Sequence, residues 1–477
     1  MKNLKAGSVL AVDLDGTLLR SDMLFESFWS ATSRDWRAPI KATAALRRGK
    51  AALKQDLAAL MDLDVTTLPY EQRVIDYVEA WRAKGGTVVL VTATNENIAS
   101  KIAEHLGIFD EVHGSNGSRN LKGGEKAIFL KSRFGERSFT YIGDSNADLP
   151  VWAEAGKAVT INLPGAVRRQ VERLGIETEH LANQRPGPRD YLRAIRVHQW
   201  LKNCLVFLPM LGAHQFDGVT FLQSLTAFVV FSFVASSVYV LNDLLDLRSD
   251  RSHPTKCRRP FAAGVIPIAQ ATYMIAGLMA VGLVLALLLG GDFVAVMLLY
   301  IVLTTAYSVW LKRKAIVDIG TLAGLYTLRI AAGAVATGIP LSVWLLAFSV
   351  FFFLSLAIVK RQAELTEGAA RGKLKAAGRG YVVDDLPVLV MMAVASGYVS
   401  VLVLALYIQS SNVKTLYVRP ELLSLICGVF LYWISRVVLI AHRGQMNEDP
   451  IVFAAYDRVS QACLLLTFAI AAAASWP

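Results

Sequence analysis

Short apolar runs and stretches of helical periodicity alternate over the first 180 residues. Five strand-like runs occupy residues 8–12, 87–93, 110–114, 138–144 and 157–161. Apolar residues recur at helical spacing in the stretches 71–84 and 97–106, which lie between them. Strands that alternate with helices predict an α/β domain of Rossmann-like type, with a parallel sheet covered by helices on both faces.

The pattern changes after residue 190. Apolar stretches of spanning length, about 20 residues each, follow one another to the end of the chain. Nine such stretches begin near residues 200, 219, 268, 293, 316, 341, 387, 421 and 452. The segment 182–190, with two Pro and one Gly, is typical of a linker. We therefore predict an α/β domain over 1–181, a linker over 182–190, and an all-α bundle of nine transmembrane helices over 191–477.

Composition supports a membrane protein. The chain is 54% hydrophobic and 18% charged, with a mean hydropathy of +0.43, whereas soluble domains are about half apolar and a quarter charged. Disordered, collagen-like and disulfide-stapled secreted folds are excluded, and we expect no nucleic-acid partner. The loops after the second, fourth, sixth and eighth expected spans together hold 15 of the 49 Lys and Arg residues. The opposite loops hold only Lys414 and Arg419. This asymmetry predicts that the basic loops and the N-terminal domain are cytoplasmic.

Acidic and hydroxyl side chains fall where the predicted strands end. Asp13, Asp15, Thr92 and Asp144 each follow a strand-like run, and ligands of parallel sheets bind at the carboxyl ends of strands. One carboxylate can attack a phosphoryl group, a second can act as general acid and base, and others can hold Mg²⁺. An acidic turn without function is the alternative, but VTAT and GDSNAD follow in the order that this chemistry needs.

These motifs resemble the haloacid dehalogenase superfamily of phosphatases over about residues 7–180. The resemblance implies a helical cap over about 21–70. It assigns the nucleophile to Asp13, the general acid and base to Asp15, phosphate binding to Thr92 and Lys126, and Mg²⁺ binding to Asp13, Asp15, Asp144 and Asp148. Lys122, in the same NLKGGEK segment, competes with Lys126 for its role.

A second acidic motif lies after the second expected span, within 241–264. Asp243, Asp246 and Asp250 are spaced i, i+3, i+7, which predicts one face of a helix. Carboxylates on one stripe repel one another unless a cation lies between them, and Mg²⁺ carrying a diphosphate meets that need. Cationic side chains that suit phosphate oxygens follow at His253, Lys256, Arg258 and Arg259. The alternative is a juxtamembrane helix with solvated charges.

NDLLDLRSD followed by HPTKCRRP resembles the UbiA superfamily of intramembrane prenyltransferases, over about residues 190–475. The resemblance implies nine helices, with Asn242, Asp243, Asp246 and Asp250 on the Mg²⁺-bound diphosphate of the donor. The chain departs from the family in the second motif loop, where Lys360 and Arg361 precede Glu364 in place of a second Asp-rich motif. A Lys-Arg pair binds an anion without metal, which suits two anionic substrates.

RVHQWLKN (196–203), Arg329, KRQAEL (360–365), RGY (379–381) and EDPIVFAAYDR (448–458) resemble the decaprenyl-phosphate phosphoribosyltransferase branch of this superfamily. This implies transfer of 5-phosphoribose from phosphoribosyl diphosphate to a polyprenyl phosphate in a bacterial-type cytoplasmic (inner) membrane. A homo-oligomer is compatible with the sequence, which does not give the oligomeric state. The fused phosphatase would then remove the 5-phosphate. The alternatives are prenyl transfer to an aromatic acceptor, and a transporter or lipid-binding scaffold.

Several polar residues have two interpretations. Arg329, inside a span, is a substrate ligand or the partner of a buried acid such as Asp318. Lys202 contacts a phosphate or extends to the membrane surface. Tyr307 and Tyr381 bind substrate or belong to an interfacial aromatic belt.

Overall fold

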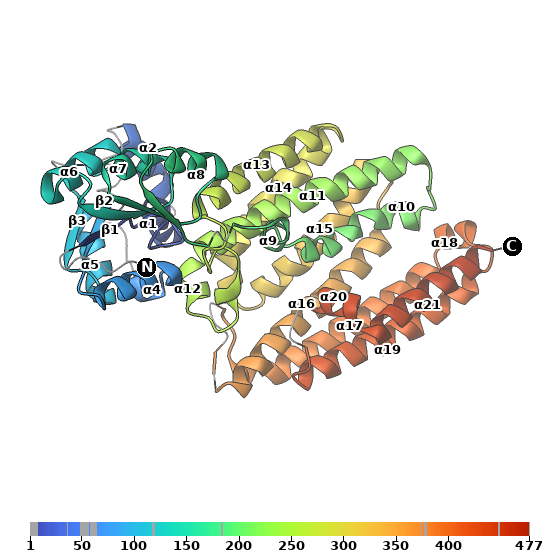
Figure 1. Cartoon of the computed structure of the whole chain (residues 1–477). Helices are drawn as coiled ribbons and strands as arrows, with labels where there is room; N and C mark the ends of the chain where they lie inside the picture. Colours follow the sequence, from blue (N-terminus) through green and yellow to red (C-terminus); the bar gives the residue numbers. More distant parts are fainter. Residues whose placement is uncertain are drawn as a thin grey trace. The chain divides into compact units, whose positions relative to one another are not determined.

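The computed structural model describes residues 8–476, apart from residues 36, 48–56, 58–63, 117–119, 183–184, 373, 376–378 and 447–448. The chain forms two compact units (Figure 1). Unit 1 comprises Met1–Ile195 and Tyr239–Ile275, and unit 2 comprises Arg196–Val238 and Ala276–Pro477. The domain boundaries expected from the sequence remain predictions.

Unit 1 contains the predicted parallel sheet. Its six strands are β1 (Val9–Val12), β2 (Thr87–Asn95), β3 (Glu111–Ser115), β4 (Phe139–Gly143), β5 (Lys157–Thr160) and β6 (Glu177–His180). All neighbouring strands run parallel, in the order β3-β2-β1-β4-β5-β6. The five expected strands are confirmed, and β6 is an edge strand that the sequence analysis missed.

Alternation along the strands buries both faces of the sheet. Leu10 and Val12 pack with α4 (Gln72–Arg82) and α5 (Glu96–Leu106) on one face. Ala11, which points the other way, packs in the cluster formed by α6 (Gly124–Phe134), α7 (Leu149–Glu154) and α8 (Gly165–Glu172). A strand covered on both sides reads as a continuous apolar run, as VLAV does. Figure 1 shows the helices on the two faces.

The expected cap is helical where it is described. It contains α1 (Met23–Arg34), α2 (Ala38–Arg47) and the short 3₁₀ helix η1 (Val65–Thr67), and part of its predicted range lies outside the described residues. The two connections to the sheet domain are bonded to each other. The Arg20 amide donates to the Pro69 carbonyl at 2.9 Å, and the Arg20 guanidinium pairs with buried Glu71 at 2.9 Å. Arg73 pairs with the same carboxylate at 2.7 Å.

The ion pairs of Glu71 make the stability of the fold depend on pH. Burial alone would raise the pKa of Glu71, but Arg73 and Arg20 lower it to about 2 from its ordinary 4.5. The ion pairs therefore stabilise the fold fully above about pH 4.5 and lose that effect as the pH falls toward 2. We expect Glu71→Gln to lower the free energy of unfolding by about 1–3 kcal/mol at neutral pH. Thermal unfolding in detergent should show the difference from wild type shrinking below about pH 4; a constant difference would contradict the assignment.

Eight helices among the described residues are long and apolar enough to cross a membrane. They are α11 (Gly218–Leu245), α13 (Ile268–Leu287), α14 (Gly291–Val309), α15 (Val317–Thr337), α16 (Val343–Ala370), α17 (Leu386–Ile408), α19 (Ser424–His442) and α21 (Arg458–Ser475).

The first of the nine expected spans is corrected by the structure. It forms the 3₁₀ helix η3 (Val197–Phe207) and the short α10 (Leu208–Gly212), neither of which is among the spanning candidates. The physical reason lies in two buried polar side chains. Lys202 and Asn203 bond to Asp449 and Ser232 inside unit 2, so this segment places polar side chains in the interior of the unit.

Short helices connect these elements. They are η2 (Asn146–Asp148), α9 (Pro188–Ala194), α12 (Leu247–Arg251), η4 (Lys256–Arg258), η5 (Leu311–Arg313), η6 (Val383–Asp385), α18 (Ser411–Leu416), η7 (Pro420–Leu423) and α20 (Pro450–Tyr456). The end of the expected linker, from Pro188, already belongs to α9, because proline fits the first turn of a helix. Residues 183–184 of that linker lie outside the described part.

Candidate functional site

The phosphatase-type residues meet at the carboxyl ends of β1 and β4. Asp13 follows β1, and its Oδ1 lies 2.8 Å from the buried Lys126 Nζ. Lys126 also donates to the Tyr141 hydroxyl at 2.9 Å, which donates in turn to Asp148 at 2.7 Å. Lys122 is exposed. The structure therefore favours Lys126 as the cation of this site, and adds Tyr141, which sequence reasoning missed.

Carboxylates outnumber cations in this site. Asp13, Asp144 and Asp148 each offer an oxygen within 4.8 Å of the others, and among the described residues they form the one acidic group close enough to share a metal ion. Burial, followed by the charges of neighbouring carboxylates, raises the pKa of Asp144 well above its usual range. Such a concentration of hard oxygen donors around a single ammonium fits Mg²⁺.

Asp15 lies outside that group and has different partners. Its carboxylate accepts hydrogen bonds from the Thr94 hydroxyl and the Met23 amide, both at 2.7 Å. Burial, with the nearby charge of Asp22, raises the pKa of Asp15 to about 7. A carboxyl that titrates near neutral pH suits a general acid and base. The structure thus gives Asp15 an acid-base environment rather than a place in the acidic group, and Thr94 is a further residue that the sequence analysis missed.

The turn after β1 requires glycine. Gly16 has φ +76°, and a Cβ there would lie 2.2 Å from Asp144 Oδ2. Glycine therefore lets the DxDGT turn approach the carboxylate closely. On the opposite side of β1, the buried Thr92 hydroxyl accepts from the Thr94 amide at 3.0 Å, which fixes the last residues of β2.

The second acidic motif does not form one helical stripe, so that expectation is wrong. α11 ends at Leu245, and Asp246 caps the separate helix α12. Asp243 and Asp250 are nevertheless both buried and both bonded to Arg259, at 3.1 and 2.6 Å. The cation that the carboxylates require is, in this structure, a guanidinium from the same loop. Asp246 is half-buried.

The other predicted residues of this loop are more accessible. Lys256 and Arg258 are exposed, and Asn242 is half-buried. The His253 Nδ1 accepts from the backbone amides of Thr255 and Lys256, at 3.3 and 3.4 Å. The imidazole thus orders the cationic turn itself.

Unit 2 holds a buried cationic cluster. Lys202 and Lys360 both reach Asp449, at 2.7 and 3.0 Å, and the Tyr326 hydroxyl donates to the same carboxylate. Burial would raise the pKa of Asp449, but Lys360 and Lys202 hold it well below its usual range. Asp449 lies in the segment 448–458 of the sequence analysis but was not singled out. Its loop position carries no periodicity that would have identified it.

Arg329 is not the partner of Asp318. Its guanidinium donates to the Asn203 side chain at 2.9 Å and to the Tyr300 hydroxyl at 3.0 Å. The rings of Phe231, Tyr300 and Tyr326 lie around it. Within the described parts of the chain, no carboxylate lies at ion-pair distance from this buried cation.

The expected anion-binding pair Lys360–Arg361 is divided between two clusters. Arg361 is buried and pairs with Asp318 at 2.5 Å and with Glu364. Arg379 also reaches Asp318, at 3.0 Å. The charge of Arg361 is therefore neutralised by the protein, and we correct its assignment as a free anion ligand.

Tyr381 has a local role in the structure. Its hydroxyl accepts from the Ile316 amide at 2.9 Å, where Ile316 has the uncommon φ of +67°. The side chain is buried rather than placed in an interfacial belt. Its expected contact with substrate remains a prediction.

Comparison with known proteins identifies both parts of the chain. Residues 204–453 match the UbiA prenyltransferase family, and residues 10–152 match haloacid dehalogenase-like hydrolase. A protein of Sinorhizobium fredii called uncharacterized protein y4nM is 37% identical over 94% of this chain and 88% of its own length. The nodulation protein NoeC of Azorhizobium caulinodans is 38% identical over 58% of this chain and 90% of its own.

A third relative is the decaprenyl-phosphate phosphoribosyltransferase of Mycobacterium tuberculosis, which is 42% identical over 36% of this chain and 59% of its own length. The family match covers more than half of the chain, and the eight spanning helices lie in and around the matched range. This chain belongs to the UbiA prenyltransferase family: it is a multi-pass membrane transferase with a haloacid dehalogenase-like hydrolase domain N-terminal to it.

Proposed function

We propose that the transferase moves 5-phosphoribose from phosphoribosyl diphosphate to a polyprenyl phosphate with Mg²⁺, and that the hydrolase domain then removes the 5-phosphate. The observation that carries the proposal is the excess positive charge in unit 2. Among the described carboxylates, only Asp449 lies at ion-pair distance from Lys202 and Lys360, and none lies at that distance from Arg329. A buried excess of cations needs an anion, and a lipid phosphate supplies one. The partial similarity to decaprenyl-phosphate phosphoribosyltransferase supports the same choice.

In the transfer step, a phosphate oxygen of the lipid attacks the anomeric carbon of the ribose. The bond from that carbon to the diphosphate breaks, and diphosphate leaves with the electron pair. Lys202 and Lys360 hold the attacking phosphate, while Asn242, Asp243, Asp246 and Asp250 with His253, Lys256, Arg258 and Arg259 bind the diphosphate end of the donor. Bound Mg²⁺ would neutralise the charge that develops on the leaving group.

In the hydrolysis step, Asp13 attacks the phosphorus of the ribose 5-phosphate, and the bond to the ribose oxygen breaks. Asp15 gives its proton to that oxygen and then accepts one from the water that hydrolyses the aspartyl-phosphate. Thr92 and Lys126 bind the non-bridging oxygens. Asp13, Asp144 and Asp148 are the residues that would hold Mg²⁺, which screens the phosphate charge.

The orientation follows from charge. The basic loops and the hydrolase domain lie on the cytoplasmic side of a bacterial-type inner membrane, so both steps take place on the same side of the bilayer. Phosphoribosyl diphosphate is a water-soluble donor, and in this orientation it reaches the basic loops from the cytoplasm.

The proposal is tested by giving membranes that contain the protein a polyprenyl phosphate, Mg²⁺ and isotopically labelled phosphoribosyl diphosphate. Mass spectrometry should find label in a polyprenyl-phosphoryl ribose. Unlabelled geranyl or longer prenyl diphosphates should not compete. Competition by them, with a prenylated aromatic product, would favour the alternative prenyltransferase.

A variant of the cationic cluster tests the acceptor assignment. We expect Lys360→Met to raise the KM for the lipid phosphate about ten-fold or more, because it removes a charge-assisted bond from a buried anion site. The KM for the sugar donor should change little. Arg371→Gln is the matched control, since Arg371 is an exposed cation just after α16. Equal effects of the two substitutions would contradict the assignment.

A further inference from the structure

The hydrolase domain and the first transferase motif belong to one compact unit. Unit 1 contains the whole hydrolase domain and also Tyr239–Ile275, which carries Asp243, Asp250 and Arg259. The cap helix α1 contacts α12, the end of α11 and the start of α13. A segment assigned to the transferase by sequence is therefore packed on the hydrolase.

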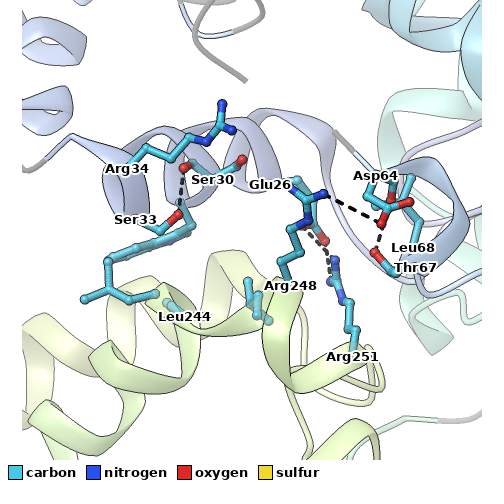
Figure 2. A pocket seen from close by; sticks show the side chains of 13 residues that line it. Glu26, Ser30, Ser33, Arg34, Asp64, Thr67, Leu68, Leu244, Arg248 and Arg251 are labelled. Atoms are coloured by element: carbon cyan, nitrogen blue, oxygen red, sulfur yellow. Dashed lines mark hydrogen bonds and ion pairs between the residues drawn. The ribbon is translucent and has the colours of Figure 1, made fainter. Parts of the chain in front are cut away.

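A buried ion pair joins α1 to α12. The Arg251 guanidinium donates to the two carboxylate oxygens of Glu26, at 2.6 and 3.1 Å. Both side chains are nearly inaccessible, with exposed fractions of 7% and 6%. Figure 2 shows the pair beside a pocket that is lined by residues of α1, the η1 segment, the end of α11 and α12. A bidentate pair of this kind fixes orientation as well as distance.

Further contacts hold the same loop. Arg251 Nε donates to the Ala262 carbonyl at 3.2 Å, so one guanidinium bonds both the cap and the far side of its own loop. The Trp29 indole donates at 3.0 Å to Thr272 of α13, the helix that follows this loop. Gly264, at φ +66°, leaves no room for a side chain, because a Cβ would lie 2.7 Å from the Arg20 Cβ.

An apolar cluster closes the interface. Trp29 of α1 packs with Val240, Leu244, Leu247 and Phe261 of the motif segment, and Phe25 and Phe28 pack against the same cluster. Burial of this cluster stabilises the contact, while the ion pair fixes the position and orientation of α12 relative to α1.

The ion pair is one residue away from the metal-type motif. Arg251 follows Asp250, whose carboxylate holds Arg259 together with Asp243. Fixing Arg251 therefore fixes the helix that presents Asp250. On the other side, α1 begins at Met23, whose amide bonds to Asp15.

We propose that Glu26 is a positioning residue of the transferase: the hydrolase domain, besides its own chemistry, holds the diphosphate-binding loop in its working conformation through the Glu26–Arg251 pair. The inference rests on the proposed function in assigning Asp243, Asp250 and Arg259 to the donor. It predicts that transfer needs the cap but does not need a working hydrolase site.

The test uses the full chain in membranes and measures transfer from phosphoribosyl diphosphate. We expect Glu26→Gln to raise the KM for the Mg²⁺-bound donor about ten-fold and to raise the Mg²⁺ requirement, as is typical when a buried charge pair is broken. The double variant Glu26→Arg with Arg251→Glu should recover much of the loss. Glu104→Gln, at an exposed position of α5 in the same unit, is the control. A merely structural role would lower the amount of active protein without changing the KM.

Hydrogen exchange gives a readout independent of the donor. Amides of 247–264 should exchange faster in Glu26→Gln than in wild type, with the sheet strands unchanged. Unchanged exchange together with an unchanged KM overturns the proposal. Faster exchange throughout the protein that the double variant does not relieve also overturns it. If wild type uses a prenyl diphosphate instead, the proposed function fails, and the same variants are compared with that donor.

Discussion

Asp13→Asn protein should accumulate the 5-phosphorylated lipid. The substitution removes the nucleophile of the hydrolase domain, so dephosphorylation should fall about a thousand-fold or more. Transfer should continue, because Asp13 has no part in the transferase and the Glu26–Arg251 contact remains. The measurement is thin-layer or mass-spectrometric separation of the two lipids after incubation with radiolabelled phosphoribosyl diphosphate.

The control for this experiment is Asp76→Asn, an exposed carboxylate of α4 in the same unit whose hydrogen bond comes only from Gln72 among the described contacts. It should give the wild-type ratio of the two lipids. If Asp13→Asn also yields the dephosphorylated lipid at the wild-type rate, the hydrolase domain acts on another phosphate, and the coupling of the two steps is wrong.

Asp243→Asn should abolish Mg²⁺-dependent transfer, with a loss of about a hundred-fold or more. Asp243 is buried and shares Arg259 with Asp250, so the neutral amide removes one of the two carboxylates that bond to this guanidinium and one of the three that would face a metal. Turnover is measured as diphosphate released against Mg²⁺ concentration. Asp246→Asn should act in the same direction.

Asp292→Asn provides the comparison, because Asp292 is an exposed carboxylate in the first turn of α14. Its turnover should match wild type. The same variants separate an enzyme from a lipid-binding scaffold. A scaffold would bind lipid equally well with either substitution and would release no diphosphate.

Sequence patterns predicted the sheet because its strands are apolar on both faces. VLAV and TVVLVTA could be recognised from that property alone. β6 could not, since ETEH is a polar edge strand that buries little. The first expected membrane span is wrong for a different reason: Lys202 and Asn203 are visible in its sequence, but their partners Asp449 and Ser232 lie elsewhere in the chain, and no local pattern reports them.

The hydrolase site followed from short motifs because its residues sit at strand ends, where the topology brings them together. The transferase residues did not. The spacing predicted that Asp243 and Asp250 lie on one helix. In the structure the helix breaks at Asp246, and the two carboxylates lie together because both bond to Arg259. The Glu26–Arg251 pair joins residues 225 positions apart, and no local pattern reports such a partner.

The aromatic face of α1 has a consequence for dividing this polypeptide. A fragment that ends near residue 190 would expose Phe25 and Trp29 to water, because they pack against residues 240–271, and it would uncover the side of Phe28 that faces the same cluster. Uncovered aromatic surface of this kind promotes aggregation. Anyone who wishes to express the hydrolase alone should therefore replace that face with polar side chains first, rather than rely on the proline-rich segment as a cutting point.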